Sequence, residues 1–101
     1  MRYSMDSKIV EFMQQYRISD LEIEDIKNIA PMIDVTSYNE FVVNCQLLTS
    51  YGYPKSDLDF LLLANPQIFV MSPKDLKNDL IKLRNEYEDI EIILKENPMI
   101  I

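Results

Sequence analysis

The chain contains no histidine and no tryptophan, and only one glycine and one cysteine among its 101 residues. Without histidine, Cys45 lacks the usual base that would activate it as a nucleophile. A single glycine cannot build the glycine-rich loop that binds phosphates, and the acidic residues show no recognisable metal-ligand spacing. These absences indicate a protein that is not an enzyme, has no cofactor and acts on no small-molecule substrate.

Long apolar runs are also absent. The most apolar segment, residues 58–64, is interrupted by Asp59 and is far shorter than the roughly 18 residues of a membrane span. Asp6, Lys8 and Glu11 fall where a signal peptide would need an apolar stretch. A single cysteine cannot form an internal disulfide, which favours a reducing compartment. We therefore expect no signal peptide, no membrane contact, and a cytoplasmic or other reducing intracellular location.

Basic residues are in the minority. The chain has 10 Lys and Arg against 17 Asp and Glu, a net charge of −7. Residues 1–52 hold 4 basic and 8 acidic residues, and residues 53–101 hold 6 and 9, so neither half is basic. Nucleic-acid binding depends largely on neutralising phosphates with Lys and Arg. The charge balance therefore disfavours nucleic acid as a partner without excluding it.

A recurring pattern of helix and proline is present instead. Three apolar helical segments run into Pro31, Pro66 and Pro98, which lie 35 and 32 residues apart. Proline stops a helix because it lacks an N–H and its ring clashes with the preceding turn. A period of this size is typical of helical repeat proteins.

The segments before each proline share one register. Ile23, Leu58 and Ile90 correspond, and so do the residues three positions later, Ile26, Leu61 and Ile93. Their spacing predicts one buried stripe on each short helix. An acidic residue recurs at each helix start, where it suits the N-cap or the first turn. These acidic residues are Glu22, Asp57 and Asp89.

Longer helices alternate with the short ones. Apolar positions in the second and third long helices are 35 residues apart, pairing Phe41 with Leu76 and Cys45 with Leu80. Cys45 is therefore expected to be a core residue. Ser37 and Glu40 form a capping-box pattern, and Gly52 stands where a left-handed C-cap is preferred. We predict six helices, at about 4–16, 20–30, 37–51, 56–65, 73–87 and 89–97.

The middle of the chain resembles a known family. Leu48–Phe69 joins a long helix, a glycine turn flanked by Tyr51 and Tyr53, a second helix and an Asn-Pro followed by apolar residues. This pattern resembles the repeat of the mitochondrial transcription termination factor (mTERF) family. The repeat signature residues are Pro31, Gly52, Asn65, Pro66, Asn97 and Pro98. The first unit departs from the pattern at Ala30-Pro31, and the last has Tyr87 in place of the glycine.

The resemblance implies an all-α fold, a short α-solenoid of about three helix pairs, each ending in a proline-terminated 3₁₀ turn. It implies one domain, 1–101, with units at about 4–36, 37–72 and 73–101. Family members are similar in binding DNA or RNA along a basic surface, whereas this chain is acidic and has few units. The fold carries over more safely than the activity.

Two candidate sites follow from the pattern. The basic residues of the last third are the candidate nucleic-acid site, although a solvated helix face of mixed charge is the more ordinary interpretation. These residues are Lys74, Lys77, Lys82, Arg84 and Lys95. The second candidate is an interface at the last unit, where a repeat stack without a capping unit exposes apolar surface. Its residues are Tyr87, Met99, Ile100 and Ile101, unless the tail folds back on its own core.

Two functions remain open from the sequence. The first is a non-catalytic helical-repeat module that binds a protein partner or self-associates. The alternative is a small mTERF-like nucleic-acid-binding protein acting in transcription or RNA handling. The tyrosines fit either function if they are exposed, or neither if they seal the ends of the core.

Overall fold

The computed structural model describes residues 4–101, which form six α-helices and no strand. The α-helices are α1 (Ser7–Gln15), α2 (Asp20–Ile29), α3 (Tyr38–Ser50), α4 (Leu58–Ala64), α5 (Pro73–Glu86) and α6 (Ile90–Glu96). Four 3₁₀ turns separate them: η1 (Pro31–Val35), η2 (Lys55–Asp57), η3 (Pro66–Phe69) and η4 (Pro98–Ile100). The all-α prediction is confirmed. The largest boundary error is at α1, which begins at Ser7 because Asp6 is its N-cap.

Hydroxyl or carboxylate side chains cap five of the six α-helices, whereas Asp57, the N-cap residue of α4, makes no side-chain capping bond. Ser37 and Glu40 form the predicted capping box of α3. A second box, which the sequence analysis missed, joins Ser19 and Glu22 at the start of α2. The Ser19 N–H donates to the Glu22 carboxylate at 2.9 Å. This bond is the largest cause of the lowered pKa of Glu22, and a hydrogen bond with the Ser19 side chain is the second. Asp89 caps α6 by accepting from the Ile92 N–H.

The three proline joints have the same backbone. The residue before each proline, Ala30, Asn65 or Asn97, has φ/ψ of −126°/71°, −152°/78° or −142°/77°. Proline disfavours helical geometry in the residue that precedes it. Each short helix therefore ends there, and the chain continues into a 3₁₀ turn that begins with the proline.

Two of the long helices end in the same left-handed turn. After α3, Gly52 has φ of 109°, and the Tyr53 N–H donates back to the Leu48 carbonyl at 3.0 Å. After α1, Arg17 takes this position with φ of 60°, and the Ile18 N–H donates to the Met13 carbonyl at 3.1 Å. Both are Schellman C-caps. The prediction for Gly52 is confirmed, and Arg17 adopts the same turn without being a glycine.

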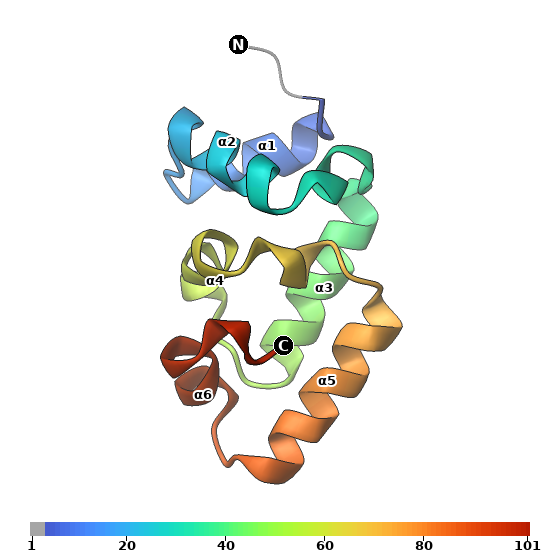
Figure 1. Cartoon of the computed structure of the whole chain (residues 1–101), viewed down its shortest axis with the longest axis vertical. Helices are drawn as coiled ribbons and strands as arrows, with labels where there is room; N and C mark the ends of the chain where they lie inside the picture. The colour runs from blue at the N-terminus through green and yellow to red at the C-terminus, as the bar shows by residue number, and fades with distance from the viewer. Residues whose placement is uncertain (1–3) are drawn as a thin grey trace.

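The helices pack in layers along the long axis of the molecule, which measures 43 × 23 × 20 Å. Figure 1 shows α1 and α2 at one end and α5 and α6 at the other, with α3 and α4 between them. The short helix α4 contacts both α2 and α6, and the long helix α3 contacts both α1 and α5. Neighbouring helix pairs therefore bury their apolar stripes against each other.

A continuous core joins the layers. Stacked and edge-on contacts between Phe12, Phe41 and Phe69 connect α1, α3 and η3, with ring centroids 5.1 and 5.5 Å apart. Leu61 belongs to α4, which contacts both α2 and α6, and its side chain is fully buried. Cys45 is also a buried core residue, as predicted.

Truncating the central apolar position should be costly. Leu61→Ala removes a side chain with no exposed surface and leaves a cavity, so we expect a loss of about 2–5 kcal/mol in the free energy of unfolding. Chemical denaturation monitored by circular dichroism measures it. Leu63→Ala, which changes a partly exposed residue of the same helix, is the control. Equal effects of the two variants would show that the register of α4 is wrong.

Substitutions at the two left-handed C-cap positions should change the free energy of unfolding in opposite directions. A Cβ at Gly52 meets no atom within 4 Å, so Gly52→Ala is strained only through its backbone and should lose about 1–2 kcal/mol. Arg17→Gly removes the same strain and should gain about 0.5–1 kcal/mol after the flexibility of glycine is allowed for. Thermal unfolding compares both with Arg17→Ala, which keeps the strain. A stabilising Gly52→Ala or a destabilising Arg17→Gly would contradict the C-cap assignment.

Candidate functional site

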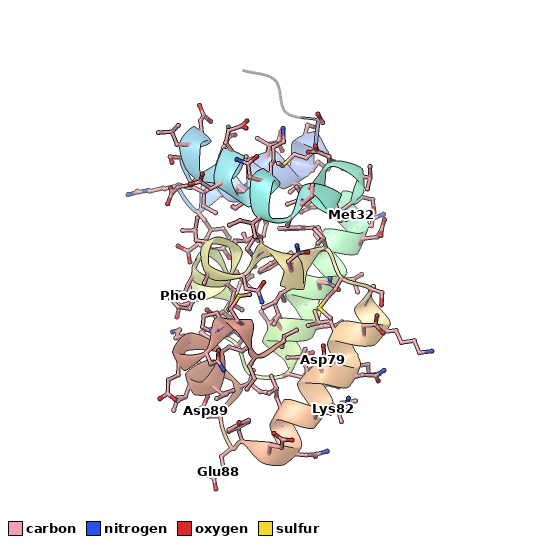
Figure 2. All side chains as sticks on the ribbon, in the orientation of Figure 1. Met32, Phe60, Asp79, Lys82, Glu88 and Asp89 are labelled. Atoms are coloured by element: carbon pink, nitrogen blue, oxygen red, sulfur yellow. The ribbon has the colours of Figure 1, made fainter. Side chains whose placement is uncertain are left out.

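The four predicted basic residues of α5 are exposed but do not share one face. A helix turns about 100° per residue. On that geometry Lys77 and Arg84 lie on one edge of the buried stripe, whereas Lys82 lies on the opposite edge. Lys82 lies beside the carboxylates of α5, about one helical turn from Asp79. Figure 2 labels both residues. The exposed surface of α5 therefore carries both basic and acidic side chains.

Lys95 is already occupied by carboxylates. Its Nζ donates to Asp57 Oδ2 at 2.6 Å and to Glu91 Oε2 at 2.7 Å. Hydrogen bonds to Asp57 and then to Glu91 raise the pKa of Lys95 above its ordinary value. Because Asp57 precedes α4, this ion pair joins the last two helix pairs. Lys95 is therefore a contact within the fold and not a free cation beside the α5 lysines.

Arg84 and Lys95 also approach the glycine turn. The Arg84 guanidinium lies 5.4 Å from the centre of the Tyr51 ring, and Lys95 Nζ lies 5.9 Å from that of Tyr53. Cations over aromatic rings are attracted by the negative ring face. These two residues therefore help to dock α5 and α6 on the turn between α3 and α4, whereas Lys82 lies on the other edge of α5.

The hydroxyls of two tyrosines, Tyr16 and Tyr53, make internal hydrogen bonds. Tyr53 is buried, and its hydroxyl donates to the Asp57 carbonyl at 2.7 Å. Tyr16 donates to the Lys55 carbonyl at 2.6 Å. Desolvation is the largest cause of the raised pKa of both groups, which reaches about 12 for Tyr53. The suggestion that tyrosines seal the core fits these two residues, but their hydroxyls bond to backbone and not to water.

The predicted interface residues at the last helix pair divide into two groups. Ile100 and Ile101 pack against the core and are partly buried, so the tail folds back. Met99 and Tyr87 remain 67% and 38% exposed.

The structure adds Ile92 to the exposed apolar residues at this end, at 55% exposed. It lies in a hollow of about 410 Å³ between the end of α5 and the start of α6. We call this surface the end face: its apolar part is Tyr87, Ile92 and Ile93, and its acidic part is Glu86, Glu88, Asp89 and Glu96. Figure 2 shows Glu88 and Asp89 at the end of the molecule far from the N-terminus.

The repeat alignment could have found the end face. Asn65 and Asn97 occupy matching joints, but Asn65 is buried and donates to the Pro98 carbonyl at 2.9 Å, whereas Asn97 is exposed. The signal in the sequence was the match between these two joints.

A second hollow of about 270 Å³ lies between α1 and α3 and is lined in part by Phe12, Tyr38, Cys45 and Leu58. Burial raises the pKa of the Cys45 thiol to about 12, so the thiol stays protonated at neutral pH and is a poor nucleophile. Cys45 therefore behaves here as a small apolar side chain.

Among residues 4–101, no group of three or more His, Cys, Asp or Glu side chains is placed to hold a metal ion. None of the helices in that range combines the length and the apolar character needed to cross a membrane.

Comparison of the chain with protein-family models, with curated proteins and with solved structures finds no match.

The Lys95 ion pairs can be tested directly. Lys95→Met removes both pairs, so we expect a lower denaturation midpoint at low salt and a smaller difference from wild type at high salt. Because the pKa of Lys95 is raised, its contribution is present below the ordinary value of 10.5 and is lost as the pH rises through the higher folded value. Lys82→Met is the control. A Lys95→Met protein as stable as wild type at low salt would contradict this role.

Proposed function

We propose that the protein is a non-catalytic binding module built as a short α-solenoid of three helix pairs. The matching backbone at Ala30, Asn65 and Asn97 supports this arrangement, as do the contacts of α4 with α2 and α6. A short α-solenoid is also what the resemblance to mTERF repeats implies. Repeat stacks present extended surfaces and commonly act by binding.

One observation carries the proposal for a protein partner. Ile26 and Leu61 occupy matching positions and are 1% and 0% exposed, in helices that each contact the next helix pair. Ile93 has the same position in α6 and remains partly exposed on the end face. The same position is thus buried in α2 and α4 and partly exposed in α6. Association with a protein, or with a second copy, would cover it.

The charges weigh against the nucleic-acid alternative. Lys95 is paired with two carboxylates, and Arg84 packs on Tyr51. Lys74, Lys77 and Lys82 are left as exposed lysines of α5, with Asp75 and Asp79 on the same helix. Since each phosphate contact needs a free cation, few are available.

Fluorescence anisotropy separates the two functions. We expect no saturable binding of labelled duplex DNA or single-stranded RNA from low to physiological salt. The matched variant is Lys74→Gln/Lys77→Gln/Lys82→Gln. Binding by wild type whose log–log salt slope falls by about 3 in this variant would support the nucleic-acid function, since each phosphate contact contributes about one unit.

The protein-binding function needs its own measurement. Light scattering over a range of concentrations tests self-association, and cross-linking followed by mass spectrometry identifies partners that contact α6. A protein that stays monomeric at all concentrations and recovers only nucleic acid would overturn the proposal.

A further inference from the structure

We infer that the end face binds an amphipathic helix of a basic partner protein, with apolar residues on one side of that helix and Lys or Arg beside them. This inference rests on the proposed function and specifies where the partner binds and of which chemical class it is.

The molecule contains a template for this contact. Leu61 of α4, which corresponds to Ile93, is fully buried, and α4 is contacted by α6 and η4 of the last helix pair. Ile90 and Leu94 form the buried side of α6, spaced by four residues as a helix that lies on a neighbour requires. A helix with the same spacing would cover Ile93.

The template also includes one cation. Lys95 follows Leu94 and reaches the Asp57 carboxylate at the start of the covered helix, at 2.6 Å. Asp89 holds the matching place at the start of α6. One of its carboxylate oxygens, Oδ1, accepts from the Ile92 N–H, and Asp89 is exposed. A Lys or Arg on the partner helix could reach Asp89 as Lys95 reaches Asp57.

The charge of the end face decides between a basic partner and a second copy. Four carboxylates line the hollow, and no basic side chain does. Two copies facing each other here would bring these carboxylates together, and like charges at an interface are unfavourable. A basic helix instead pairs with the carboxylates while its apolar side meets Ile92 and Ile93. This is the helix-in-groove mode of recognition, in which residues at i and i+4 are the anchors.

The test uses the full-length chain labelled with ¹⁵N and a synthetic helical peptide of Leu and Lys with its leucines on one face. We expect amide shift changes concentrated in residues 86–97 during the NMR titration. A peptide in which every Lys is replaced by Glu should not bind. Binding should weaken with added salt, because the carboxylates of the end face are exposed.

Two matched pairs of variants separate the end face from general attraction to an acidic protein. Glu86→Gln/Glu88→Gln/Glu96→Gln should weaken binding at least about tenfold. Glu11→Gln/Glu24→Gln/Asp25→Asn, which removes the same charge elsewhere, should leave affinity unchanged. Ile92→Ser should weaken binding, whereas Leu21→Ser, which changes a residue that is 78% exposed on α2, should not.

Several results would overturn the inference. The first is an equal loss in both triple variants, and the second is shift changes spread over the whole acidic surface. The third is a concentration-dependent dimer that buries residues 86–97, which would assign the end face to a second copy. Peptide binding in the hollow between α1 and α3, seen at Phe12 and Cys45, would also overturn it but would leave the binding function standing. Only exclusive binding of nucleic acid would remove both.

Discussion

The structure depends on the inability of proline to continue a helix. At Pro31, Pro66 and Pro98 the missing N–H and the ring end a short helix and force the preceding residue out of helical geometry. The chain then turns through a 3₁₀ segment into the following residues. Without these stops, the helical pattern before each proline would continue away from the core, and the neighbouring helix pairs could not lie side by side as they do in Figure 1.

Polar contacts between neighbouring helix pairs fix their relative positions. Asn65 donates to the Pro98 carbonyl, and Gln67 donates to the Ile29 carbonyl at 2.8 Å. Within the middle helix pair, the buried Asn44 amide of α3 donates to the Ile68 and Met71 carbonyls. Each bond satisfies a carbonyl at or near a proline turn, where the helical ladder cannot supply a donor. The prolines that end the short helices thus leave carbonyls without a helical donor, and these carbonyls accept hydrogen bonds from side-chain amides elsewhere in the fold.

The distribution of charge follows from the same packing. The cations that lie near a neighbouring helix pair, Lys95 and Arg84, are held by carboxylates or by tyrosine rings within the molecule. Several carboxylates line the end face around the exposed Ile92. An acidic end with apolar side chains in it is suited to a basic protein surface and unsuited to phosphates. This contrast separates the proposed function from the activity that the resemblance to mTERF repeats would imply.

The sequence by itself determined the features that arise within a few residues of one another. The six helices, the proline joints, the Ser37 capping box and the Gly52 turn all depend on local hydrogen bonds and backbone sterics, so spacing along the chain predicts them. The left-handed turn at Arg17 was not predicted from the sequence, because an arginine gives no local signal for positive φ. Only the tertiary structure decided that Lys95 pairs with Asp57, 38 residues away. It also decided that Leu61 is buried while Ile93, in the same register, is partly exposed, because burial depends on whether another helix pair lies against that face.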